Sequence, residues 1–379
     1  MKILHVVAGD MGGGANRGAA NLNDLMVQQG LTSDILNLRN LKSYSSRGLA
    51  LAQRRLNHHL CKIISPKEFF NLFLPLPSPD LAIDDADIIN LHWSAGHIAP
   101  SFFSRHADKL VVTLRDEWMF TGGCHTSLGC HGFQEGCPSC PIVIPSARAL
   151  VERSARLKHD AFRKLRAPII SIGENLAKRA RGSSVMAGKE IVVIPNYIPA
   201  LLPDPHHDES HRFDYFLFVA TNLDVFHKGA DLLEEVGAPV YMVGSPGSLS
   251  PSRFGPQVRF LGPVLDRKRL ANLIAGARAL LVPSRAEAFG KVVLEAFSVG
   301  TPVIAHAIDE LALLVEPGRN GFLVNESVPS AFSTAVKQLE QFSDDRYLKM
   351  RQGARARYDE LMKPEAIVQR HLEVYQRVG

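Results

Sequence analysis

Two carboxylates stand eight positions apart in PSRAEAFGKVVLEAFSVGTPVIA, residues 283–305. A strand is predicted to end at Pro283, so Glu287 lies in the following loop and Glu295 lies inside the next helix. Because that helix begins near Gly290, its free backbone N–H groups create an anion site that needs no metal ion. Carboxylates beside such a site suit a ligand with both hydroxyl groups and phosphates, such as a nucleotide sugar.

A lysine followed by glycine, Lys228-Gly229, stands in FVATNLDVFHKGADLL, residues 218–233. An ammonium group at this place could stabilise the negative charge that develops on a departing phosphate. Taken alone, a Lys-Gly pair is more often part of an ordinary exposed surface turn. The two glutamates are likewise compatible with an ordinary exposed helix.

A glycine-rich loop, Gly9–Gly14, follows the first predicted strand and precedes a helix. Its glycines approach a dinucleotide-binding fingerprint, but the required glycine at position 17 is replaced by Arg17. No acidic residue ends the second strand, where Leu36-Asn37-Leu38 stands. The pattern therefore disfavours a nicotinamide-dependent dehydrogenase. The glycines either let a ligand approach the backbone or only form a tight strand-to-helix turn.

Four of the five cysteines fall within 17 residues of one another. In a reducing compartment, this spacing favours a structural zinc site that holds an irregular loop. Disulfides, redox sensing and unligated thiols remain as alternatives, and His125 and His131 are spare ligands. The predicted zinc ligands are Cys124, Cys130, Cys137 and Cys140.

Short apolar runs alternate with helical patterns along the whole chain, as in parallel sheets buried on both faces. The first series comprises residues 2–8, 33–38, 87–93, 110–114, 168–172 and 191–195. The second comprises 214–221, 239–244, 258–262, 279–283, 302–306 and 321–324. A proline-rich polar stretch, 197–212, separates them and is predicted to be a linker. We therefore expect an α/β protein with two doubly wound Rossmann-like domains facing a cleft, where the ligands bind.

Composition and charge narrow the class of protein. The 379 residues are 46% hydrophobic and 21% charged, which excludes a mostly disordered chain. No apolar run approaches a membrane span, and the first residues lack a signal-peptide layout, so we expect a cytoplasmic protein. The net charge is +5, and residues 148–181 hold ten basic and three acidic residues. This stretch is either a solvated helix face or a contact with an anionic partner such as a membrane surface, and it matches no nucleic-acid reader motif.

The segment 283–305 closely resembles the Glu-x7-Glu signature of glycosyltransferase family 4, whose members are retaining enzymes with the GT-B fold. This resemblance implies that Glu287 holds donor-sugar hydroxyls, Glu295 holds the ribose, and Lys228 contacts the donor diphosphate. It places further donor contacts at the glycine loop and at the start of the helix. Those contacts are Gly13, Gly14, Asn222, Phe289, Gly290 and Lys291.

The stretch TLRDEWMFTGGCHTSLGC, which begins at Thr113, resembles a subgroup of the family that builds bacterial exopolysaccharide and O-antigen repeats. The subgroup has His where this chain has Arg115, so Asp116 could take over as base or orient the acceptor hydroxyl. Arg115 could instead bind an anionic sugar or phosphate. His92 and Trp93, at the carboxyl end of a strand, join Arg115 as expected acceptor-side residues.

Other positions depart from the family pattern. Asn222 and His227 stand where arginines are common, so fewer fixed charges would hold the diphosphate. Asp309-Glu310 replaces the usual glycine pair, which adds negative charge near the donor. These departures keep open a nucleotide-sugar-binding pseudoenzyme or regulatory partner without turnover.

The sequence thus predicts a metal-independent retaining glycosyltransferase that uses a nucleotide diphosphate sugar. Its acceptor would be a saccharide or a polyprenyl-linked saccharide, and it would act in surface polysaccharide synthesis at the inner face of the membrane. The expected catalytic residues are Asp116, Lys228 and Glu287. The expected domains are 1–198 with a Cys-rich loop at 121–141, 199–360, and a C-terminal helix at 361–379 that packs toward the first domain.

Overall fold

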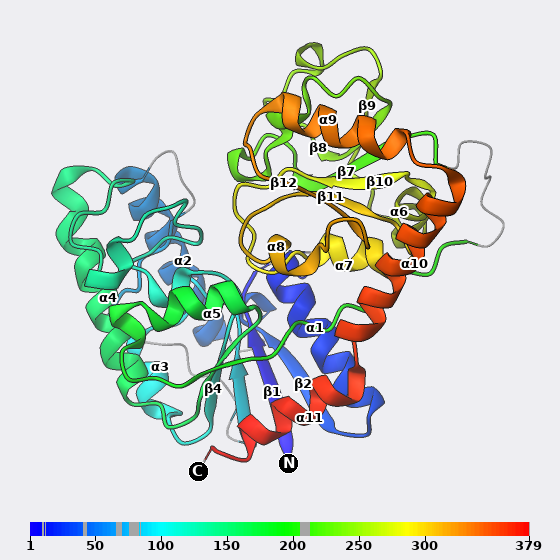
Figure 1. Ribbon diagram of the computed structural model, residues 1–379. Coiled ribbons are helices and arrows are strands. Elements are labelled where there is room, and N and C mark those ends of the chain that lie inside the picture. The colour runs from blue at the N-terminus through cyan, green and yellow to red at the C-terminus, as the bar shows by residue number, and fades with distance from the viewer. Residues whose placement is uncertain are drawn as a thin grey trace. The chain divides into compact units, whose positions relative to one another are not determined.

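The computed structural model describes residues 1–9, 11, 13–40, 44–65, 70–75, 83, 85–204 and 213–378 (Figure 1). Asp10 and Gly12 of the glycine-rich loop and residues 205–212 of the predicted linker lie outside these ranges. The chain divides into two compact units. The first unit consists of Met1–Tyr197 and Pro364–Gly379, and the second of Ile198–Lys363. Each unit holds a six-stranded parallel sheet, so the predicted α/β class with two doubly wound sheets is confirmed.

The sheet of the first unit has the strand order β2-β1-β3-β4-β5-β6. Strands β3 and β4 are buried along their whole length, as expected for parallel strands covered on both faces. The strands span Lys2–Val7 (β1), Thr32–Asn37 (β2), Ile88–Leu91 (β3), Leu110–Leu114 (β4), Ile169–Ser171 (β5) and Ile191–Val193 (β6).

The helices of the first unit include its C-terminal segment, which returns from the second unit. Helix α11 contacts α1, and the Tyr375 hydroxyl accepts a hydrogen bond of 2.7 Å from the buried Asn90 amide on β3. This bond fixes the last helix over the middle of the sheet. The helices span Gly14–Gln28 (α1), Tyr44–Ile64 (α2), Pro100–Arg105 (α3), Arg148–Arg163 (α4), Glu174–Arg181 (α5) and Pro364–Tyr375 (α11).

The sheet of the second unit has the order β12-β11-β10-β7-β8-β9. Its strands span Phe216–Asn222 (β7), Val240–Ser245 (β8), Val258–Gly262 (β9), Ala279–Val282 (β10), Val303–His306 (β11) and Gly321–Val324 (β12). Its helices span Arg267–Gly276 (α6), Lys291–Ser298 (α7), Leu311–Leu314 (α8), Pro329–Glu340 (α9) and Asp344–Leu361 (α10). One apolar core joins side chains of β7, β8 and β10 to those of α9 and α10.

Two glycines give the loops of the second unit their shape. Gly229 has a φ of +71°, and a Cβ atom there would lie 2.0 Å from the Pro283 carbonyl oxygen. Gly290, the N-cap of α7, has a φ of +78°, and a Cβ atom would lie 2.8 Å from Leu314. Only glycine fits both the angle and the space at these two positions. The loop after β7 can therefore approach the end of β10 closely at Gly229.

The basic stretch 148–181 is not simply a solvated face. Lys158 is buried, and its ammonium group donates to the carbonyl oxygens of Trp118 and Thr121. Burial lowers the pKa of Lys158 to about 7. Arg179 Nε donates to Glu117 at 2.7 Å. The stretch therefore has fewer charges for an external partner than its composition suggests.

Candidate functional site

In the second unit, the structure brings together two of the predicted donor-binding residues. Lys228 follows β7, Glu287 lies in the loop after β10, and Lys228 Nζ donates to Glu287 Oε2 at 2.8 Å. Burial by itself would raise the pKa of Glu287. The Lys228 ammonium and the Gly290 backbone N–H outweigh it and hold that pKa below its usual range. The result is an ionised carboxylate and a cation placed side by side.

The start of α7 lies next to this pair. Its N-cap is Gly290, whose backbone N–H donates to Glu287 and whose carbonyl oxygen accepts the Val293 N–H at 3.0 Å. The positive end of the helix dipole therefore lies at this pair. Glu295 is 6% exposed and lies 3.4 Å from Lys291 Nζ, one turn away. Phe289 is buried beside the turn, and Asn222 is exposed at the end of β7.

An ion pair that sequence reasoning missed joins the two loops of this region. Arg285 donates to both carboxylate oxygens of Asp231, at 2.8 and 2.7 Å. Its backbone N–H also donates to the His227 carbonyl oxygen at 2.8 Å. The pair fixes the loop that carries Glu287 against the loop that carries Lys228. Arg285 lies within the segment 283–305, but Asp231 is 54 positions away and no local pattern connects them.

The departure at Asp309 has a structural role. Asp309 has a φ of +42°, a left-handed conformation that glycine adopts without strain and that Asp tolerates better than most residues. Its Oδ2 accepts the Glu287 backbone N–H at 3.3 Å. The carboxylate therefore supports the Glu287 loop and also adds negative charge to it.

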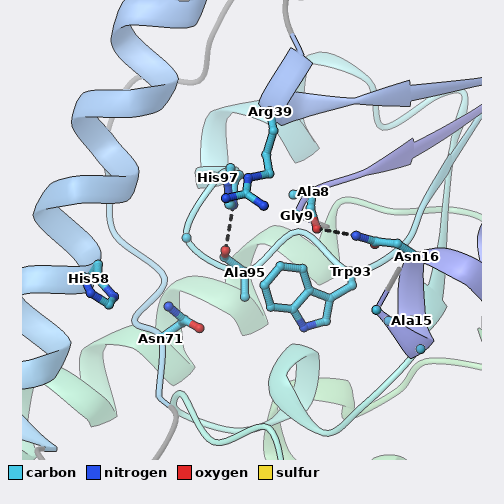
Figure 2. A pocket seen from close by; sticks show the side chains of 13 residues that line it. Ala8, Gly9, Ala15, Asn16, Arg39, His58, Asn71, Trp93, Ala95 and His97 are labelled. Atoms are coloured by element: carbon cyan, nitrogen blue, oxygen red, sulfur yellow. Dashed lines mark hydrogen bonds between the residues drawn. The ribbon is translucent and has the colours of Figure 1, made fainter. Parts of the chain in front are cut away.

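In the first unit, a pocket of about 410 Å³ opens at the carboxyl ends of β1 and β3 (Figure 2). The indole of Trp93 forms one wall, and the backbone at Gly9, Gly13 and Gly14 forms another. Gly9 has a φ of +108°, and a Cβ atom there would lie 3.4 Å from the Trp93 ring. The remaining lining residues are Ala8, Ala15, Asn16, Arg39, His58, Asn71, Ala95, Gly96 and His97.

A hydrogen-bonded chain behind this pocket fixes the Trp93 ring. Asp116 Oδ2 accepts from Trp93 Nε1 at 2.9 Å and from His125 Nδ1 at 2.7 Å. Asp116 Oδ1 accepts the Trp118 backbone N–H at 2.9 Å. Because both oxygens are engaged, the geometry favours Asp116 as an anchor of the pocket wall over a free base.

His125 contacts an oxygen acceptor with each ring nitrogen. Its Nε2 lies 2.8 Å from Asn71 Oδ1, and the Asn71 amide donates to Asn57 Oδ1 at 3.3 Å. The Asn57 amide in turn donates to the Leu72 carbonyl oxygen at 2.6 Å, which fixes the orientation of both amides. The ring of His125 is therefore held between the Asp116 carboxylate and the Asn71 amide. The sequence suggested His125 only as a spare zinc ligand, because its partners at 71 and 116 are distant along the chain.

Asp116→Asn is expected to lower the free energy of unfolding by about 2 kcal/mol, because one carboxylate oxygen now accepts from two partly buried donors. The tryptophan fluorescence should also change, because Trp93 is one of only two tryptophans. Urea unfolding followed by fluorescence measures both effects. Asp160→Asn, on the exposed face of α4, is the matched control. Equal unfolding midpoints for the two variants would contradict the anchoring role.

The other two predicted acceptor-side residues are buried and do not line the pocket. His92 accepts from Arg115 Nη2 at 2.9 Å and lies 2.9 Å from His5 Nδ1. Arg115 also donates to Asn196 Oδ1 and lies against Gly18 of α1. Burial lowers the pKa of Arg115 to about 9. This arrangement makes Arg115 an internal cation rather than an open anion-binding group.

The zinc prediction has no support from the positions of the cysteines. Among the described residues, no group of three or more His, Cys, Asp or Glu side chains is arranged to hold a metal ion. Cys137 Sγ accepts the Gly122 N–H at 3.2 Å. A thiol–thiol hydrogen bond with Cys124 lowers the pKa of Cys140 to about 6. The cysteines are free thiols packed within the loop.

Part of this chain is similar in sequence to known proteins. Residues 216–341 match the family model described as "Glycosyl transferases group 1". D-inositol 3-phosphate glycosyltransferase of Streptomyces avermitilis is 38% identical over 119 residues, which are 31% of this chain. The matched region spans 25% of that relative's length. The residues that match the family model all lie in the second unit.

Solved structures resemble the whole chain. Sucrose-phosphate synthase of Thermosynechococcus elongatus has a TM-score of 0.65 at 16% identity, covering 100% of this chain and 99% of its own. Anabaena HepE in complex with UDP has a TM-score of 0.63 at 16% identity, covering 99% and 100%. At this identity the likeness concerns the fold, and the GT-B fold predicted from the sequence is confirmed.

A search of the described residues for membrane-spanning segments found no helix with the length and apolar character that crossing a bilayer requires.

Proposed function

We propose that this protein is a retaining glycosyltransferase that takes a sugar from a nucleotide diphosphate donor. The observation that carries the proposal is the Lys228–Glu287 pair beside the Gly290 start of α7, within the matched residues 216–341. It joins a cation, an ionised carboxylate and the positive end of a helix dipole, which are groups that suit the hydroxyls and the phosphates of a sugar diphosphate. A uridine nucleotide is the first donor to test, because Anabaena HepE was solved with UDP and with UDP-glucose.

In this proposal, the second unit stabilises the leaving group. Lys228 and the N–H groups at Phe289, Gly290 and Lys291 contact the diphosphate and offset the charge that grows as the glycosidic bond breaks. Glu287 holds hydroxyl groups of the sugar, and Glu295 holds the ribose. These fixed charges and dipoles stabilise the leaving group without a divalent metal ion. The acceptor oxygen bonds to the anomeric carbon on the face from which the nucleoside diphosphate departs, and the departing phosphate oxygen takes the proton of the acceptor hydroxyl.

The pocket of the first unit is the proposed acceptor site. Its indole wall suits the apolar face of a sugar ring, and Arg39 and the pocket histidines suit hydroxyl or phosphate groups. We propose a saccharide or lipid-linked saccharide as acceptor, in surface polysaccharide synthesis at the cytoplasmic face of a membrane. The departures at Arg115 and Asp309 favour one second candidate, a nucleotide-sugar-binding protein without turnover.

Glu295→Ala is expected to weaken donor binding at least about tenfold, because it removes charge-assisted hydrogen bonds to the ribose. Wild-type protein, Glu295→Ala and the exposed control Glu340→Ala are titrated with UDP- and GDP-sugars, and slow donor hydrolysis is recorded. Binding and hydrolysis by wild type and the control, lost together in Glu295→Ala, support the enzyme. Binding without hydrolysis or transfer to any acceptor supports the second candidate, and no binding of any donor contradicts both.

A further inference from the structure

Helix α2 has an unusual charge composition. Its 21 residues, YSSRGLALAQRRLNHHLCKII, contain four Arg or Lys and two His but no Asp or Glu. An ordinary solvated helix mixes both signs of charge, because opposite charges at i, i+4 stabilise it. A helix with only basic charges is favoured where an anionic surface lies against it.

The described part of α2 also exposes large apolar side chains. Leu56 is 53% exposed and Ile63 is 56% exposed, and they share one helix face with the exposed His59. The exposed Arg55 and Lys62 flank that face, also seven positions apart. The opposite side packs into the unit through the buried residues Asn57, Cys61 and Ile64. Among the described residues, the packing of α2 therefore leaves its Leu56–Ile63 face exposed.

A further exposed apolar side chain lies at the end of α2. The Ile144 backbone N–H donates to the Ile64 carbonyl oxygen at 2.9 Å, so the loop of Ile144 lies at the end of α2. Ile144 is itself 40% exposed. These apolar side chains therefore lie near basic ones. We name as the lipid-facing surface the residues Arg55, Leu56, Lys62, Ile63 and Ile144.

We propose that the lipid-facing surface docks the protein on an anionic membrane. Exposed aliphatic side chains enter the headgroup boundary while Arg and Lys contact anionic headgroups, and neither kind of contact suffices alone. Nucleic acid fits less well, because exposed Leu and Ile have no role against phosphates and offer no aromatic stacking.

The surface has a consequence for the acceptor, which rests on the proposed function. His58 of the same helix lines the pocket, on the opposite side of Asn71 from Trp93 (Figure 2). The pocket-lining His58 is two positions from Leu56, so the pocket and the lipid-facing surface share one turn of α2 on different faces. This places a lipid-linked saccharide, rather than a freely diffusing one, within reach of the acceptor site.

Co-sedimentation of the full chain with vesicles tests the proposal. Binding is expected to phosphatidylcholine vesicles that contain phosphatidylglycerol, to be weak without it, and to fall as salt rises. Leu56→Ser with Ile63→Ser should weaken binding at least about tenfold, through lost apolar contact. Arg55→Glu with Lys62→Glu should weaken it at least as much, through charge reversal.

Matched controls come from the second unit. Leu265→Ser replaces an apolar side chain that is 93% exposed, and Arg267→Glu with Lys268→Glu reverses two exposed charges at the start of α6. Circular dichroism and thermal unfolding confirm that each variant folds. Equal vesicle binding by wild type, surface variants and controls would overturn the proposal. Vesicle binding that weakens in the charge-reversal variant but not in Leu56→Ser with Ile63→Ser would also overturn it. Tighter binding to nucleic acid than to the vesicles would overturn it as well.

The outcome is separable from the proposed function. UDP-sugar binding in solution does not require the lipid-facing surface, so its variants should bind donor like the wild type. Vesicle binding without donor binding would retain the membrane surface and contradict the transferase. Donor binding without vesicle binding would support the proposed function and contradict the membrane surface.

Discussion

Lys228→Met is expected to lower the turnover number of sugar transfer by about 100- to 1,000-fold, with a smaller effect on donor affinity. Lys228 contacts Glu287 at 2.8 Å and has a flexible chain that can turn to a bound diphosphate. The charge on the leaving phosphate is larger in the transition state than in the bound donor. Removal of a positioned cation therefore costs more in turnover than in binding.

Single-turnover rates and donor titrations separate these two effects. Lys228→Arg keeps the charge and should retain more activity than Lys228→Met. The control is Lys337→Met, which removes an exposed lysine from α9 of the same unit. A turnover number for Lys228→Met within threefold of the wild type would exclude Lys228 from leaving-group stabilisation.

The same variant also tests the pairing in the free protein. Without Lys228, burial should raise the pKa of Glu287, since the ammonium that holds it down is gone. The loop would then carry a carboxylate near Asp309, whose own carboxylate accepts the Glu287 N–H. Lys228 is thus expected to neutralise this loop until a donor binds.

Acidification from pH 7 to pH 4.5 is expected to lower the free energy of unfolding by at least about 5 kcal/mol. Burial lowers the pKa of His5 to about 3 and that of His371 to about 4, and nearby positive charge from Arg115 contributes to both. The pKa of the buried His92 is lowered as well, first by burial and then by Arg115. These rings are neutral in the folded protein around a buried cation.

The sign follows from proton uptake. Below pH 6.5 the unfolded chain protonates these histidines while the folded protein does not, so stability falls as the pH decreases. Each depressed histidine costs about 1.4 kcal/mol per pH unit until its folded pKa is reached. His5 and His371 together give about 5 kcal/mol at pH 4.5, and His92 adds to the loss.

Urea unfolding at pH 7 and pH 4.5 measures this loss. His371→Gln removes one titrating ring and should reduce the pH dependence by about 2.5 kcal/mol. His59→Gln, at an exposed position of α2, should leave it unchanged. An unfolding free energy that is constant between pH 6.5 and pH 4.5 would refute the neutral state of the buried histidines. A chain with two units can unfold in more than one transition. The free energies at the two pH values are therefore compared for the transition in which the first unit unfolds, since it contains the three histidines.

Local pattern was enough to predict the two sheets. Buried parallel strands such as β3 and β4 need continuous apolar runs, and Leu110–Leu114 and Ile88–Leu91 supply them. The glycines that bring Lys228 and Glu287 into contact are also visible locally, because Gly229 and Gly290 must adopt positive φ. The pair itself was expected only through resemblance to a family.

The hydrogen-bonded chain around the pocket was beyond local pattern. His125 joins Asp116 to Asn71, and Asn57 of α2 fixes that amide, although these residues span four different elements or loops. The sequence suggested that His125 could be a zinc ligand, because Cys124 is adjacent to it. Tertiary packing instead gives its two nitrogens oxygen acceptors.

The sequence by itself determined the doubly wound α/β class, the strand-to-loop positions of Lys228 and Glu287, and the excess of basic charge. Only the tertiary structure decided which of those charges face outward. Lys158 and Arg115 are buried against backbone carbonyls and a histidine, whereas Arg55 and Lys62 remain exposed beside Leu56. Burial depends on what packs against a side chain from distant segments, and composition contains no record of those contacts.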